Sequence, residues 1–214
     1  MKLASYVGTQ SGYKGLGNIL IRLRIAGIKE AIHLKPYGGT TLRASHSEVV
    51  FEPTDGVGHL MPDGTCKPDS EGRLWCASST GMDILPSWSK RRAGKLGGVR
   101  FKRINVSNTD KWELQTIHNT DAELVAKFFK DNEGALYDWQ AIVSFIAKFI
   151  PDKDGRFMCS EVIAASLYIP DSAKVNPCDL QETVNNINCK NTKSNITESI
   201  LNTKQFFLRS TGND

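Results

Sequence analysis

Apolar and polar positions divide the chain into a β-rich middle and a more helical later part. Four stretches combine β-branched or aromatic residues with polar neighbours, and we predict strands over residues 45–51, 74–78, 99–104 and 112–117. Residues 52–72 are rich in Gly, Pro and Asp, which predicts a long loop after the first strand. The middle of the chain is therefore expected to be an antiparallel sheet of short strands.

Helical spacing of apolar residues is found before and after this sheet. Before it, the pattern favours a short amphipathic helix within residues 15–30, followed by a turn at 36–39. After it, Thr120 or Asp121 can cap a helix that ends at Gly134. The combination of a sheet and separate helices indicates an α+β class.

The later helices begin at recognisable signals. Tyr137-Asp138-Trp139 is expected to open a helical run to residue 150, and residues 151–155 a loop. Good helix formers with an apolar stripe predict a helix over residues 159–168. Asn176 and Pro177 are typical of another helix start. From residue 185 the chain is weakly patterned and reads as a peripheral extension, with a last strand at 205–208.

Length and composition are those of one soluble globular domain. The chain has 214 residues, of which 40% are hydrophobic and 23% charged. The first 15 residues lack the apolar core of a signal peptide, and the most apolar run, 141–150, is too short to span a membrane. We therefore expect a soluble protein with no transmembrane segment.

The positive charge is unevenly placed. The net charge is only +4, yet the segment Lys90–Arg103 holds seven basic residues and no acidic one. One interpretation is a solvated loop that runs into a strand. The other is a contact for an anionic partner, such as nucleic acid, a cell-wall polymer or a lipid surface.

The cysteines indicate reduced thiols rather than a disulfide framework. There are five, which is an odd number, and none forms a CxxC pair. This favours a reducing, cytoplasmic-type compartment. His59, Cys66 and Cys76 do not have the spacing of a usual zinc site, so no metal and no cofactor are predicted.

Cys159 is the best candidate for a nucleophile. It follows a Gly-containing loop and begins a predicted helix, where unpaired backbone N–H groups and the helix dipole favour the thiolate. Its own N–H can also donate to an oxyanion during acyl transfer. The competing interpretation is a small buried side chain, because a lone cysteine at a helix start is more often structural.

His46 is the best-placed base for such a thiol. It lies on a predicted strand, and Glu48 shares its face because strand side chains repeat every two residues. Glu48 is therefore a candidate to orient the imidazole, and Ser78 on the next predicted strand is the alternative. A histidine with a purely structural hydrogen bond is the competing reading.

A set of motifs occurs in a recognisable order. They are SHSEVVF at 45–51, GGVRF at 97–101, YDW at 137–139 and CSE at 159–161. Spread over residues 5–182, this order resembles the circularly permuted papain-like cysteine hydrolases, which include the bacterial YiiX-like proteins. That family is similar in fold to NlpC-type cell-wall peptidases and lecithin retinol acyltransferase. Ser47 departs from the pattern, since a small apolar residue is usual there.

The resemblance implies a permuted papain-like domain over residues 1–184, with an extension at 185–214. It maps His46 and Cys159 onto the base and nucleophile of a thiol hydrolase or acyltransferase, and Glu48 onto a position that is often polar. The implied substrates are peptide, cell-wall or other acyl compounds. A cell-wall substrate would require export, for example with a phage particle or a secretion apparatus.

A second function class stays open from the sequence. It is a non-catalytic structural or binding protein on the same fold, for example a phage-encoded one, that uses the basic segment 90–103. A third reading is an acyltransferase that acts on lipids.

Overall fold

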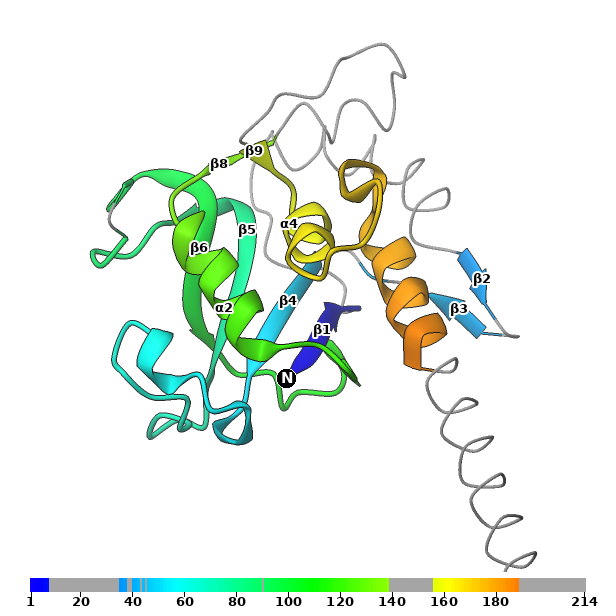
Figure 1. Cartoon of the computed structure of the whole chain (residues 1–214), viewed down its shortest axis with the longest axis horizontal. Helices are drawn as coiled ribbons and strands as arrows, with labels where there is room; N and C mark the ends of the chain where they lie inside the picture. The colour runs from blue at the N-terminus through cyan, green and yellow to red at the C-terminus, as the bar shows by residue number, and fades with distance from the viewer. Residues whose placement is uncertain are drawn as a thin grey trace, which may run out of the picture.

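A five-stranded antiparallel sheet forms the centre of the protein, in the order β6–β5–β4–β1–β7 (Figure 1). The computed structural model describes residues 1–7, 35–37, 40–42, 44, 46–89, 91–138 and 156–188. The sheet strands are β1 (Lys2–Tyr6), β4 (His46–Phe51), β5 (Leu74–Ile84), β6 (Leu96–Ile104) and β7 (Trp112–Thr116). The expected α+β class with an antiparallel sheet is confirmed.

Smaller elements surround this sheet. The helices are α2 (Ala122–Asp131), α4 (Cys159–Ser166) and an unlabelled helix over residues 177–188, with short 3-10 turns η1 (Pro53–Asp55), η2 (Gly58–Leu60) and η3 (Ser172–Lys174). β2 (Lys35–Tyr37) pairs antiparallel with β3 (Thr40–Leu42). β8 (Leu136–Tyr137) pairs parallel with β9 (Arg156–Phe157).

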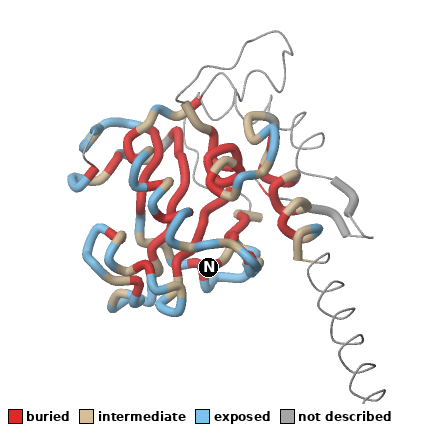
Figure 2. Tube along the Cα trace, viewed as in Figure 1, coloured by how far each residue is buried: buried red, intermediate tan, exposed pale blue. Residues whose placement is uncertain are grey.

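The main hydrophobic core lies between one face of the sheet and the helices α2 and α4. Figure 2 shows the buried residues concentrated in the strands and in α4. Phe51, Phe101 and Phe129 are among the largest fully buried side chains of this core, and they come from β4, β6 and α2. α4 packs against β4 and β5, so the first residue of α4 is held above the sheet.

β1 was not predicted from the sequence. Residues 2–6 read KLASY, without a β-branched residue, yet they pair with β4 on one side and β7 on the other. Leu3, Ala4 and Ser5 are fully buried there. Pairing with two neighbours decides this strand, because strand propensity depends strongly on tertiary context.

β5 and β6 are longer than the strands predicted over residues 74–78 and 99–104. They pair with each other from Leu74↔Ile104 to Ile84↔Leu96. Gly98 lies in β6 at φ +139°, and a Cβ there would come within 2.5 Å of the Ala135 carbonyl oxygen. The missing side chain lets the segment after α2 approach this edge strand. Val99 N–H donates to the Ala135 carbonyl at 2.9 Å, and Gly134 N–H donates to the Val99 carbonyl at 2.9 Å.

The predicted helix starts are confirmed by their caps. The Asp121 carboxylate accepts hydrogen bonds from the N–H groups of Glu123 and Leu124 at 2.8 and 3.3 Å. Asn176 does the same for the N–H groups of residues 178 and 179, at 2.9 and 3.0 Å. The helix over 159–168 is confirmed as α4, which ends at Ser166.

One expectation requires correction. Tyr137 lies in strand β8 and does not open a helix, because it pairs with Phe157 of β9. The helix at 177–188 includes residues 184 and 185, between which the sequence predicted a domain boundary. Asn188 Nδ2 donates to the Thr116 carbonyl at 2.7 Å, so the end of this helix is tied to β7.

Other expected elements lie outside the described residues: the helix within 15–30, the rest of the run to residue 150, the loop at 151–155 and the strand at 205–208. Within the described part of the chain, none of the helices has the length and apolar character needed to cross a membrane.

Candidate active site

His46 and Glu48 lie side by side at the start of β4. They share one face of the strand, and His46 Nε2 is 2.7 Å from Glu48 Oε1. The His46 side chain is 23% exposed, whereas that of Glu48 is 1% exposed. The imidazole is therefore held from its buried side by a carboxylate.

Cys159, the first residue of α4, lies against the same imidazole. Burial by itself lowers the pKa of His46. The charge of Cys159 and its hydrogen bond to the imidazole, together with Glu48, outweigh burial and raise this pKa to about 10. Because Nε2 is engaged with Glu48, Nδ1 is the ring nitrogen available to the thiol. This arrangement places a potential base beside the thiol.

Glu48 is in turn held by Arg100 of β6. Arg100 Nη1 donates to Glu48 Oε2 at 2.7 Å, and Nη2 donates to Oε1 at 2.6 Å, so the pair is bidentate. Burial tends to raise the pKa of Glu48, but the Arg100 guanidinium and then His46 lower it to about 2. Glu48 is therefore ionised throughout the neutral range.

Ser78 does not contact His46 as the alternative orienting residue would. Its hydroxyl donates to the Ser47 carbonyl at 2.6 Å and lies in the buried sheet. Ser78 pairs with Arg100 across β5 and β6. Its small side chain leaves room for the guanidinium to reach across β5 to Glu48 on β4, over two strand spacings of about 4.8 Å each.

The residues after Cys159 fix the start of α4. Ser160 Oγ donates to the Val175 carbonyl at 2.6 Å, and Glu161 accepts from the Met158 N–H at 3.0 Å. Helix N–H groups in the first turn have no intrahelical partner and carry the positive end of the helix dipole. The Cys-Ser-Glu motif therefore combines one reactive group with two residues that position it.

The basic segment 90–103 is only partly a solvated stretch. Arg100 is 3% exposed and belongs to the site described above. Arg103 lies 4.7 Å from the Trp75 ring centroid and donates to Asp63 at 2.6 Å. Lys102 pairs with Asp83 at 3.0 Å. Arg100 is thus unavailable to a surface anion, and an anionic partner for the rest of the segment stays a prediction.

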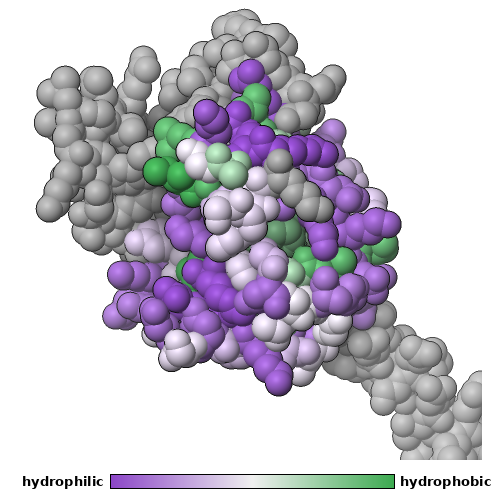
Figure 3. All heavy atoms as spheres, turned by 90° about the vertical axis from the view of Figure 1, so that its left-hand side faces the viewer, coloured by the Kyte–Doolittle hydropathy of each residue, from purple (hydrophilic) through white to green (hydrophobic). Residues whose placement is uncertain are grey.

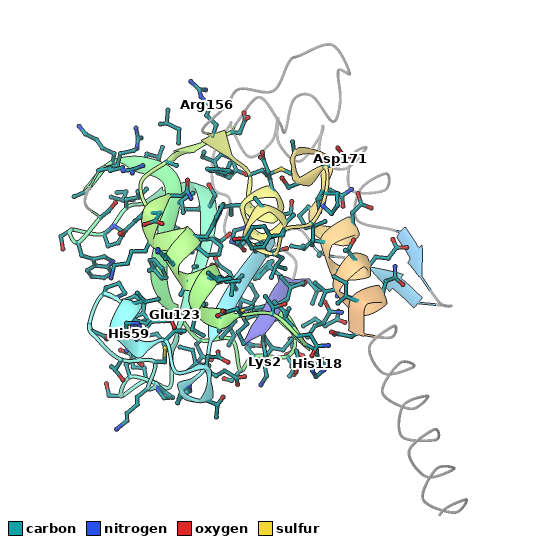
Figure 4. The ribbon with its side chains drawn as sticks, in the orientation of Figure 1. Lys2, His59, His118, Glu123, Arg156 and Asp171 are labelled. Atoms are coloured by element: carbon teal, nitrogen blue, oxygen red, sulfur yellow. The ribbon has the colours of Figure 1, made fainter. Side chains whose placement is uncertain are left out.

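The remaining histidines lie elsewhere or outside the described residues. His59 is on η2 beside Glu123 of α2, with Nε2 and Oε1 3.9 Å apart, and His118 follows β7 (Figure 4). His33 is not among the described residues. Within the described ranges no cluster of three or more His, Cys, Asp or Glu could hold a metal ion, and Cys66, Cys76, Cys159 and Cys178 are free thiols.

A cavity of about 470 Å³ lies beside the edge strand β6 and shares Arg100 with the site described above. It is lined by Trp75 and Trp88, whose ring centroids are 5.8 Å apart, together with Ile84, Arg73 and residues 100–103. Figure 3 shows the side of the molecule that carries the β5–β6 hairpin, where green apolar atoms lie among purple hydrophilic ones. Ile84 and Trp88 are 70% and 47% exposed.

Comparison with models of protein families, with curated proteins and with solved structures finds no match to this chain. The site is therefore interpreted from its own geometry.

Sequence reasoning named Cys159, His46 and Glu48, and the structure brings these three together. It missed Arg100. The pattern offered one signal, namely that Arg100 lies between the apolar residues Val99 and Phe101 in a predicted strand. A buried arginine requires an acidic partner, but alternation alone could not say that this partner is Glu48.

Proposed function

We propose that this protein is a thiol hydrolase that acts on an amide, peptide or ester bond, with Cys159 as nucleophile and His46 as base. The observation that carries the proposal is the His46 imidazole, which contacts the Cys159 side chain and Glu48 together. A base between a nucleophile and an orienting carboxylate is the arrangement that activates a thiol.

The reaction follows from these contacts. His46 takes the proton of the Cys159 thiol, and the sulfur forms a bond to the substrate carbonyl carbon. The oxyanion that results is stabilised by N–H groups of the first turn of α4. His46 then returns the proton to the leaving amine or alcohol as the carbon–nitrogen or carbon–oxygen bond breaks. In the second half, His46 deprotonates a water whose oxygen bonds to the carbonyl carbon, the carbon–sulfur bond breaks, and the proton returns from His46 to the Cys159 sulfur. Another acceptor in place of water would make the protein an acyltransferase.

A papain-like fold with permuted chain order is part of this proposal. A helix that begins at the nucleophile packs against an antiparallel sheet whose strand carries the base, which supports that fold type. In papain-type enzymes the cysteine precedes the histidine along the chain, whereas here His46 precedes Cys159. Circular permutation accounts for the reversed order. Peptide or cell-wall amides are the substrates to test first.

The test is the pH dependence of Cys159 alkylation by iodoacetamide, followed by peptide mass spectrometry. In the wild type we expect labelling at pH 5.5 to be on the order of tenfold or more faster than that of an ordinary thiol. His46→Ala should remove this advantage, because the thiolate loses the imidazolium that stabilises it. A panel of peptide, cell-wall and ester substrates then follows, with Cys159→Ala as the inactive control.

Cys66 is a matched internal control. It has the same exposure as Cys159, 4%, but the charges that act on its thiol are those of Asp55, Asp63 and Arg103 rather than that of an imidazole. Burial, followed by the charges of Asp55 and Asp63, raises the pKa of the Cys66 thiol. Equal labelling of Cys66 and Cys159 at pH 5.5, in both wild type and His46→Ala, would exclude an activated thiol and refute the proposed function.

The cavity beside β6 favours a second candidate, a binding protein that takes an anionic ligand with a flat apolar part. Two tryptophans and several basic side chains line it. Against this function, Arg73, Lys102 and Arg103 already have acidic partners. Tryptophan fluorescence titrated with such ligands tests it: this function requires saturable quenching that weakens with salt and persists in Cys159→Ala.

A further inference from the structure

A line of contacts with alternating charge extends from the thiol of the proposed active site through the sheet. His46 contacts Cys159 and Glu48, Glu48 contacts Arg100, and Arg100 contacts Asp83 at 3.3 Å. Exposure rises outward from 1% at Glu48 and 3% at Arg100 to 31% at Asp83. Glu48 and Arg100 are the two most buried charges of this line, and each mainly neutralises the other.

We propose that Arg100 is a positioning residue of this site, which keeps Glu48 ionised and aimed at His46 so that the imidazole can hold the proton of the thiol. This inference rests on the proposed function of Cys159 and His46. It assigns a role in the reaction to a residue that touches neither the nucleophile nor the base in any contact described.

The geometry shows how Arg100 can act through Glu48. One carboxylate oxygen, Oε1, is shared: it lies 2.6 Å from Arg100 Nη2 and 2.7 Å from His46 Nε2. The second guanidinium nitrogen binds Oε2, so the fork fixes the plane of the carboxylate as well as its position. Asp83 holds the guanidinium from the other side at 3.3 and 3.4 Å.

Charge explains why that position matters. A carboxyl group as buried as Glu48 would favour its neutral form without a cation beside it. Neutral Glu48 no longer attracts the imidazolium, so His46 would release its proton more readily. The thiolate–imidazolium pair would then lose population to neutral thiol and neutral imidazole, and labelling of Cys159 would shift to higher pH.

A double-mutant cycle separates this role from a purely structural one. The proteins are wild type, Glu48→Gln, Arg100→Met and the double variant, each measured for thermal unfolding and for the pH of half-maximal Cys159 alkylation. Each single variant removes the main partner of a buried charged group, so its unfolding temperature should fall. Each should also move the labelling midpoint upward by about one pH unit or more.

The double variant distinguishes a positioning role of Arg100 from a purely structural one. It has no unpaired buried charge, so its unfolding temperature should recover towards that of the wild type, while its labelling midpoint should stay as high as in the single variants. A labelling midpoint that recovers together with the unfolding temperature would show that Arg100 acts only through stability and would overturn the inference. So would an Arg100→Met profile identical to the wild type.

Two further variants keep the test usable if a single variant fails to fold. Arg100→Lys keeps the charge but loses the fork, and we expect a smaller upward shift of the midpoint. Arg103→Met removes another ion-paired arginine of β6, which binds Asp63 instead, and should lower stability without moving the midpoint. If Cys159 of the wild type is labelled with the pH dependence of an ordinary thiol, the proposed function itself is overturned. If Cys159 is labelled at low pH and neither Arg100→Lys nor Arg100→Met moves the midpoint, only this inference is overturned.

Discussion

The ion pair between Glu48 and Arg100 makes stability depend on acid in a way that one substitution can isolate. Glu48 has its pKa lowered from 4.5 to about 2 in the folded protein, because Arg100 and His46 outweigh the effect of burial. A carboxyl group with a depressed pKa contributes stability above its unfolded pKa, and that contribution is lost as the pH falls towards the folded pKa. The relevant window is therefore pH 4.5 down to about 2.

The size of the effect follows from the shift. At 1.36 kcal/mol per pKa unit, ionised Glu48 contributes on the order of 3 kcal/mol to the free energy of unfolding at pH 7. At pH 3 roughly 2 kcal/mol of this is already lost. Residue 48 cannot titrate in Glu48→Gln, and at pH 7 this variant should be destabilised by about 3–5 kcal/mol because the buried Arg100 loses its main partner.

The assay is urea unfolding of wild type and Glu48→Gln, followed by tryptophan fluorescence at several pH values between 7 and 3. Trp75 is a buried residue of β5 and reports on the main core. The difference in unfolding free energy between the two proteins should narrow by roughly 2 kcal/mol over this range. Other carboxylates titrate equally in both proteins and cancel in the difference. A gap that stays constant from pH 7 to 3 would refute the pairing of Glu48 with Arg100.

Four further substitutions test the elements that hold the site. Ser78→Leu should block the path of Arg100 to Glu48, lowering the unfolding temperature and raising the pH of half-maximal Cys159 labelling; an unchanged labelling profile would contradict the path. Ser160→Ala removes the buried hydrogen bond to the Val175 carbonyl and should cost about 1–3 kcal/mol in urea unfolding; an unchanged free energy of unfolding would contradict that bond. Asp121→Ala removes the α2 cap and should cost about 1 kcal/mol by the same assay. Gly98→Ala should lower the free energy of unfolding by at least about 1 kcal/mol more than Gly94→Ala. Both glycines have positive φ, but of the two only Gly98 has a backbone oxygen within 2.5 Å of the added Cβ. Equal losses of unfolding free energy would contradict the close approach to Ala135.

The elements with strong local signals were predictable from sequence. β4 ends in β-branched and aromatic residues, α2 begins at a capping aspartate, and α4 is a run of good helix formers. The same local logic placed His46 and Glu48 on one face, since two residues along a strand return to the same side. Local signals failed at β1, whose five residues carry no strand pattern and depend on partners far along the chain.

Sequence by itself determined which groups this protein has for chemistry: a thiol at a helix start, a histidine on a strand and a carboxylate two residues later. Only the tertiary structure decided that Cys159 lies against His46, more than one hundred residues away, and that Arg100 is the partner of Glu48 rather than a surface cation. The physical reason is that strand alternation and helix capping act over a few residues. Contacts across β4, β5 and β6 depend instead on strand order and register, which the burial of both sheet faces selects.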